Sequence, residues 1–131
     1  MKNLITLKNL FLSSLLISNI AVADVPANQV IEVNHLLAFV KESGCIINRN
    51  GTDHPAVKGI SHIEKKYDYF RDDIKSTEEF IEYSATKSTM SGDYYMVSCP
   101  GKKTIRTQDW LMSELKRYRS EKRDHLKPSA F

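Results

Sequence analysis

The chain has 131 residues, in which 19 Lys and Arg stand against 16 Asp and Glu, for a formal net charge of +3. That length allows one domain with one modest core and excludes two. Nucleic-acid binding needs clustered Lys and Arg, and the one basic stretch, Lys116–Lys127, is interrupted by Glu121 and Asp124. We therefore expect no nucleic-acid partner and interpret this stretch as a solvated tail.

The first 23 residues are predicted to be a cleaved secretory signal peptide. Lys2 and Lys8 precede an apolar run, and Ala21–Ala23 supplies the small residues that a signal peptidase requires. The apolar run, Leu10–Ile20, is too short for a membrane-spanning helix, so we expect no integral membrane segment after cleavage. We expect this signal to direct the protein to the periplasm, with cleavage before Asp24. Cleavage would leave 108 of the 131 residues and lower the formal charge from +3 to +1.

Two cysteines, Cys45 and Cys99, remain in the mature chain. In an oxidising compartment such a pair normally forms a disulfide, and two reduced, buried thiols are the alternative. Closing a loop of about 54 residues would stabilise the fold by roughly 4 kcal/mol in the chain-entropy model.

Apolar residues recur at steps of three and four in four segments, which is the spacing of one face of a helix. The predicted helices are, in chain order, Val30–Val40, Pro55–Ile74, Ser76–Ala85 and Thr107–Arg119. Asp53 is predicted to cap the second helix and Thr107 the fourth. The segment Ser76–Glu79 has the pattern of a capping box and should start the third helix.

Two short segments are predicted to be strands. Cys45–Asn48 is rich in β-branched residues and precedes the turn residues Asn50 and Gly51, while Tyr94–Cys99 alternates between its two faces. A disulfide between the start of one strand and the end of the other would set them antiparallel. The predicted fold is therefore α+β, with about four helices packed on a two-stranded antiparallel sheet.

This pattern divides the chain into four parts. Residues 1–23 are the signal peptide, 24–29 an exposed leader, 30–119 a single α+β domain, and 120–131 a charged, flexible tail.

The order of the motifs in the domain is distinctive. After a secretory signal and a leading helix, the chain carries Cys45, Arg49-Asn50-Gly51, His62-Ile63, Glu79-Phe80-Ile81, the loop Ser88–Gly92, Tyr95, Cys99 and Trp110-Leu111. In this order the motifs resemble the YfeK-like family of small exported bacterial proteins, a domain of unknown function, over residues 30–119. Thr89 and the segment Gly59–Ile63 depart mildly from the family pattern and leave His62 in register. The resemblance implies an exported α+β domain and no known activity.

Arg49 and Asn50 lie at the end of the first predicted strand, where a turn can direct their side chains and free N–H groups outward. They could bind an anion or a peptide carboxylate, with Asn50 orienting it. Alternatively, Asn50-Gly51 is a plain turn and Arg49 pairs with an acid such as Asp53.

His62 borders the apolar face of the second predicted helix. As a general base it would need a nucleophile and an orienting partner, whereas a half-buried, hydrogen-bonded imidazole needs neither. His54 and His62 are eight residues apart, roughly 12 Å along one helix, which is too far for a shared zinc ion. Since the expected disulfide removes both thiols as ligands, we expect no metal site and no cofactor.

The loop that precedes the second strand carries Ser88, Thr89 and Ser91. These hydroxyls could form a rim beside the Arg49 turn if the loop folds over the strand ends. Otherwise the loop is an ordinary connector. Tyr69 and Tyr94 are predicted to point outward, as suits protein contacts.

Two functions are compatible with these residues. The first is a non-enzymatic binding or inhibitor-type protein that engages a periplasmic protein or an envelope component through Arg49, Asn50, His62, Ser88 and Ser91. The second is a small periplasmic hydrolase, with His62 as the base and Ser88 or Ser91 as the nucleophile. Because no complete catalytic constellation is present, the sequence favours the first.

Overall fold

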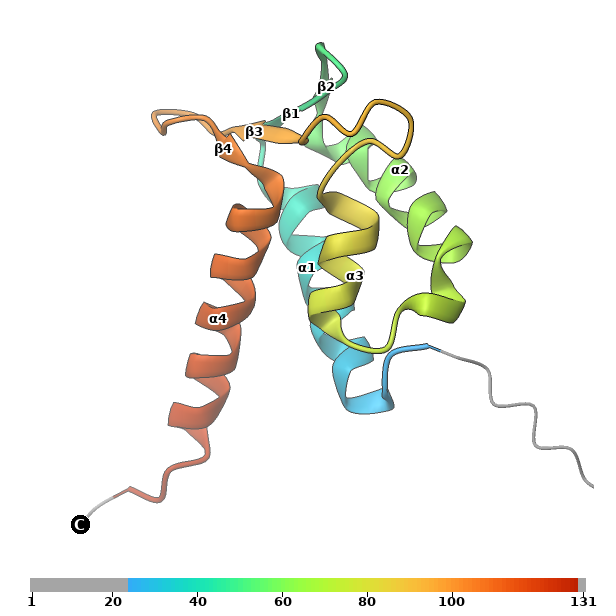
Figure 1. Cartoon of the computed structure of the whole chain (residues 1–131). Coiled ribbons are helices and arrows are strands. Elements are labelled where there is room, and N and C mark those ends of the chain that lie inside the picture. The colour runs from blue at the N-terminus through green and yellow to red at the C-terminus, as the bar shows by residue number, and fades with distance from the viewer. Residues whose placement is uncertain (1–23, 130–131) are drawn as a thin grey trace, which may run out of the picture.

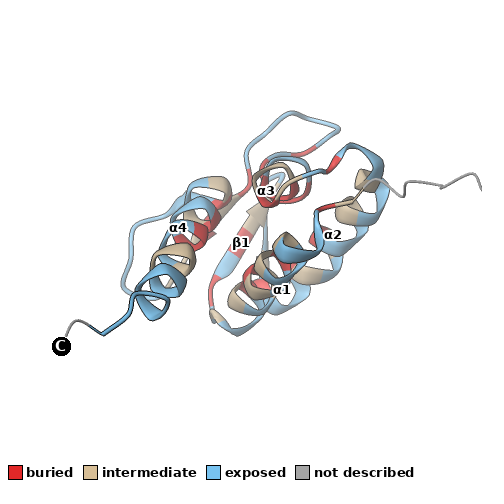
Figure 2. Cartoon of the chain, turned by 90° about the horizontal axis from the view of Figure 1, so that it is seen from below, coloured by how far each residue is buried: buried red, intermediate tan, exposed pale blue. Residues whose placement is uncertain are grey.

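The computed structural model describes residues 24–129, so the predicted signal peptide lies outside the described residues. Within this range four α-helices and four short strands form a mixed α+β fold, with the sheet across one end of the helices (Figure 1). Seen from below, α2 and α4 lie on opposite sides of α1 and α3 (Figure 2). No helix between residues 24 and 129 is long and apolar enough to cross a membrane. The elements are, in chain order, α1 (Ala27–Glu42), β1 (Ile46–Arg49), β2 (Thr52–Pro55), α2 (Ala56–Tyr69), the 3-10 helix η1 (Arg71–Asp73), α3 (Thr77–Ala85), β3 (Met96–Ser98), β4 (Ile105–Arg106) and α4 (Thr107–His125).

The sheet of the described chain has four strands in the order β2-β1-β3-β4, and neighbouring strands are antiparallel. The prediction of a two-stranded sheet is therefore wrong, although the predicted pair is present as β1 beside β3. The two strands that were not predicted lie at the edges, and most of their residues are exposed. Strands so short and so exposed lack the alternation of apolar and polar side chains by which a strand is recognised in a sequence.

A tight turn connects β1 to β2. Asn50 and Gly51 both have positive φ, of 51° and 79°, as a two-residue hairpin turn requires, so the predicted turn is confirmed. Asp53, however, lies in β2, where its carboxylate accepts a hydrogen bond from the side-chain Nδ2 of Asn48 at 2.8 Å. Since α2 begins only at Ala56, the prediction of Asp53 as its N-cap is wrong.

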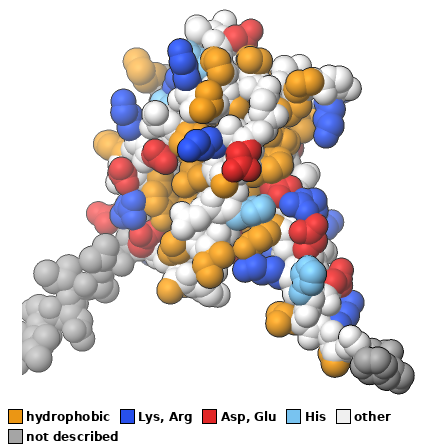
Figure 3. Space-filling view, turned by 180° about the vertical axis from the view of Figure 1, so that it is seen from behind, with side chains coloured by type: hydrophobic (Ala, Val, Ile, Leu, Met, Phe, Trp, Pro, Cys, Tyr) orange, Lys and Arg blue, Asp and Glu red, His pale blue; other side chains and the backbone are white. Residues whose placement is uncertain are grey.

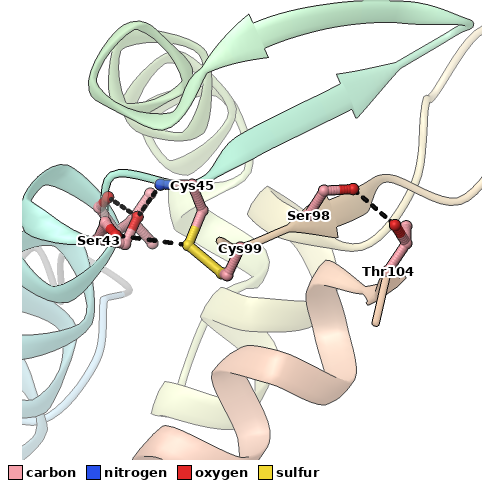
Figure 4. Close-up of a disulfide and its surroundings, with 6 residues drawn as sticks. Ser43, Cys45, Ser98, Cys99 and Thr104 are labelled. Carbon is pink, nitrogen blue, oxygen red and sulfur yellow. Dashed lines mark hydrogen bonds between the residues drawn. A yellow bond between two sulfur atoms is a disulfide. The ribbon is translucent and has the colours of Figure 1, made fainter. Parts of the chain in front are cut away.

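A disulfide joins Cys45 to Cys99, with 4.3 Å between their Cα atoms (Figure 4). It links the residue before β1 to the residue after β3, which confirms the predicted pairing. The Ser43 hydroxyl accepts a hydrogen bond from the Cys45 amide at 3.2 Å. In the ladder Ile47 faces Val97, two residues inward from the cysteine on each side, so the covalent bond and the register agree.

The core lies between the helices and the inner face of the sheet. Its largest fully buried apolar side chains are Phe80, Leu36, Ile74, Ile81, Leu111, Val40 and Val97. α2 approaches β1 closely at Gly59, where a Cβ atom would lie 3.1 Å from the Cδ1 atom of Ile47. This close approach places the side chains of α2 beside the end of β1.

The starts of α3 and α4 differ in kind. The Ser76 hydroxyl accepts a hydrogen bond from the Glu79 amide at 3.1 Å, which confirms Ser76 as the cap of α3. Thr107 is the first residue of α4 and not its cap, and its buried hydroxyl has no partner in the described part of the chain. Its amide instead donates to the Tyr95 carbonyl at 2.9 Å, so a backbone contact with the segment before β3 orients the start of α4.

Arg119 connects α4 to two other helices. Its guanidinium donates to Glu32 on α1 at 2.6 and 2.9 Å and also to Glu78 on α3. The helix then continues to His125, further than the apolar spacing indicated. Acidic and basic side chains lie next to one another along this projecting end (Figure 3).

Candidate functional site

The candidate site forms where β1 and β3 end. Asn48 pairs with Met96 in the antiparallel ladder, so the next residues, Arg49 and Tyr95, come to the same end of the sheet. The Tyr95 amide donates to the Thr86 carbonyl at 3.0 Å, and its side chain is only 4% exposed. The tyrosine is therefore buried and attached to the end of α3.

Two side chains of α2 approach the Tyr95 hydroxyl. His62 and Lys66 are about one helical turn apart and project from the same face of the helix. The Nε2 atom of His62 lies 3.1 Å from the Tyr95 Oη atom, and the two rings meet edge to face. The Lys66 ammonium donates to the Lys87 carbonyl at 2.7 Å and lies 3.5 Å from the same hydroxyl. We call Arg49, His62, Lys66 and Tyr95 the basic cluster.

The charge of Arg49 acts on every other member of the basic cluster. Burial, together with the positive charges of Arg49 and Lys66, lowers the pKa of His62 to about 4, so the imidazole is neutral at pH 7. Burial and then Arg49 also lower the pKa of Lys66. Burial raises the pKa of Tyr95, and Arg49 opposes that change. At neutral pH the cluster thus combines two cations with two neutral hydrogen-bonding groups.

The cations of the basic cluster have no acidic partner in the part of the chain that the structure describes. None of the ion pairs formed within residues 24–129 includes Arg49, Lys65 or Lys66. The Nε atom of Arg49 is buried and makes no hydrogen bond to any described residue. Arg71 and Arg119, by contrast, each bind two carboxylates. Because a partly buried cation without a counterion is costly, an incoming anion would be stabilised at the basic cluster.

Two open hollows adjoin the basic cluster, and both are lined mostly by apolar atoms. The first has a volume of about 370 Å³ and is lined by Lys66, Phe70, Glu82, Tyr83, Lys87, Ser88, Thr89 and Gly92. The second, which we call the α2 hollow, has a volume of about 350 Å³ and is lined by His62, Lys65, Lys66, Tyr69, Phe70 and Thr89. Only the first hollow includes an acidic side chain among its lining residues.

The loop Ser88–Gly92, which we call the serine loop, folds over the turn between β1 and β2. The Ser91 hydroxyl donates to the Asn50 side-chain oxygen at 2.7 Å, so two predicted site residues from distant parts of the chain are in direct contact. Ser88 is buried, and its hydroxyl accepts hydrogen bonds from the amides of Met90 and Ser91 at 3.3 Å. Ser88 therefore shapes the loop, and Ser91 attaches it to the turn.

A known family spans the elements that build this site, from the start of α1 into α4. A family model described as "Family of unknown function (DUF5329)" matches residues 27–119. The chain belongs to this family. No curated protein and no solved structure matches the chain significantly.

In this DUF5329 domain the predicted site residues divide into two contacts. Arg49 and His62 belong to the basic cluster, whereas Asn50 contacts Ser91 at the adjacent turn. The catalytic pairing of His62 with a serine is not formed, because its hydrogen bond is to Tyr95. The described residues also contain no group of three His, Cys, Asp or Glu side chains that could hold a metal ion.

Sequence reasoning missed two members of the DUF5329 basic cluster, Lys66 and Tyr95. Lys66 follows His62 by four residues, so the helical spacing that placed His62 could also have placed it. Tyr95 belongs to the predicted strand Tyr94–Cys99 but lies just before β3, which begins at Met96, and it is buried with its hydroxyl 3.1 Å from His62 on α2.

Proposed function

We propose that the mature chain is an exported, non-enzymatic binding protein whose basic cluster receives an acidic group of a periplasmic protein or envelope component. One observation carries the proposal. Arg49 and Lys66 act together on a buried tyrosine and a neutral histidine, and neither cation forms an ion pair within residues 24–129. An acidic ligand would supply the missing counterion and charge-assisted hydrogen bonds.

The surroundings of the basic cluster suit a macromolecular partner. Tyr69 on the rim of the α2 hollow is 81% exposed, and Met90 in the serine loop is 97% exposed. Tyrosine and methionine are enriched in protein interfaces because both provide large, adaptable contact areas. The exposed aromatic and thioether groups would therefore pack around a partner whose acidic group enters the cluster.

The alternative of a hydrolase receives no comparable support. A histidine with a pKa of about 4 is a weak base, far from the near-neutral value that favours general-base catalysis. The hydroxyl of Ser91 donates to Asn50, and that of Ser88 accepts two backbone amides. Both serines are thus accounted for by the structure of the loop.

The export of the protein rests on its predicted signal peptide and on its resemblance to the YfeK-like family. The disulfide between Cys45 and Cys99 agrees with an oxidising compartment such as the periplasm.

Affinity capture from periplasmic extract tests the proposal. The double variant Arg49→Gln/Lys66→Gln should lose a partner that the wild-type protein retains, and raising the salt concentration should release it. The matched control is Lys41→Gln/Lys58→Gln, which removes two charges from exposed positions on α1 and α2. Equal recovery by all three proteins, or recovery of no specific partner, would contradict the proposal.

A further inference from the structure

The two hollows beside Lys66 differ in charge. Glu82 lines the first hollow, where its carboxylate would repel an anion. The α2 hollow brings Lys65 and Lys66 together with the neutral His62, and its lining includes no acidic side chain. An anion is therefore favoured in the α2 hollow over its neighbour.

The α2 hollow also has an apolar wall. Tyr69 and Phe70 meet edge to face, with 4.8 Å between ring centroids, and both rings line the hollow. Since Tyr69 is 81% exposed, much of its ring remains available for contact with a ligand. Lys65 and Lys66 line the same hollow, so it combines cations that can bind an anion with an apolar wall.

The position of the hollow on α2 bears on the type of anion. Phosphate sites commonly use backbone amides at the N-terminus of a helix. The helix begins at Ala56, whereas Lys65, Lys66 and Tyr69 belong to its last two turns. The donors at the hollow are therefore the side chains of Lys65 and Lys66, without the amides of a helix N-terminus that phosphate sites commonly use.

We propose that the acidic group bound at the basic cluster is a carboxylate on an apolar stem, with the stem against Tyr69 and Phe70 in the α2 hollow. This inference rests on the proposed function, because it names the ligand chemistry of the same site. The surface that lines the hollow is mostly apolar, so each methylene added to the stem removes further apolar surface from water.

Titration of the mature protein with acetate, butyrate, hexanoate and octanoate, followed by NMR of the His62 ring protons, tests the inference. Each added methylene should tighten Kd by up to about fourfold until the hollow is filled. The His62 pKa should rise on binding, because a nearby negative charge favours the protonated imidazole. Tyr69→Ala should weaken octanoate and leave acetate unchanged, whereas the control Tyr94→Ala should alter neither.

The outcomes separate this inference from the proposed function. If acetate and octanoate bind equally well and both still depend on Lys66, the binding of an apolar stem in the α2 hollow is overturned, while the anion site remains. Octyl phosphate that binds more tightly than octanoate would overturn the assignment to a carboxylate. If no anion shifts the His62 resonances, and Lys66→Gln changes nothing, both proposals fail.

Discussion

The neutral imidazole of His62 makes the stability of the protein depend on pH. The unfolded chain binds a proton at His62 near its ordinary pKa of about 6.5, whereas the folded protein does so only near the pKa of about 4. Between these values the unfolded state holds more protons, so stability is fully present above pH 6.5 and is lost as the pH falls toward 4.

The magnitude follows from the same two pKa values. Integrating the proton difference from pH 8 to pH 5 gives an upper bound of about 2 kcal/mol for this one group. Because His62 is only partly buried, solvent screening reduces the expected loss to about 1 kcal/mol. The window is chosen because the carboxylates of Glu32, Glu78 and Glu114 have lowered pKa values and stay ionised throughout it.

Urea unfolding of wild type and His62→Gln at pH 8 and pH 5 measures this term. The variant should lose about 1 kcal/mol less than wild type between the two pH values. His125→Gln, at an exposed position near the end of α4, is the matched control and should behave as wild type does. An identical pH dependence in wild type and His62→Gln would refute the reasoning about the basic cluster.

Three further changes should alter stability at neutral pH, each measured by urea unfolding. Cys45→Ala/Cys99→Ala should lower the free energy of unfolding by about 4 kcal/mol, because the unfolded chain loses its crosslink. Reductant should then have no further effect, and a loss below about 1 kcal/mol would contradict this prediction. Ser76→Ala should cost about 1 kcal/mol through the lost cap of α3, while Ser76→Asp should restore it. Asp24→Asn should cost about 1 kcal/mol, since the carboxylate accepts hydrogen bonds from Tyr67 and Arg71; an unchanged midpoint would argue against that contact.

Features that depend on local or covalent chemistry were predictable from the sequence. The apolar spacing identified four helices, the Ser76 hydroxyl identified the start of α3, and the two glycine-compatible positions at Asn50 and Gly51 identified a hairpin turn. The disulfide could be expected because a chain that is predicted to be exported and has two cysteines after its signal leaves one pairing. The strands β2 and β4 could not be predicted, since they are strands because of backbone pairing with a neighbour and not because of their own side chains.

Part of the basic cluster could have been predicted from the antiparallel pairing of the two strands. Cys45 and Cys99 face each other across an antiparallel pair, so counting four residues inward from each cysteine leads to Arg49 and Tyr95. The lack of an acidic partner for Arg49 among the described residues could not be predicted in this way. Asp53 was a plausible partner for Arg49, but in β2 its carboxylate binds Asn48 instead.

The outward course of α4 decides how this protein should be attached to a surface. Its last turns run away from the sheet, and α4 ends on the opposite side of the molecule from the turn between β1 and β2 (Figure 1). A bead or sensor chip coupled at the end of α4 would leave the α2 hollow and the serine loop facing solution. Coupling at Asp24, the predicted first residue after cleavage, would instead disturb its carboxylate, which accepts a hydrogen bond from Tyr67 on α2.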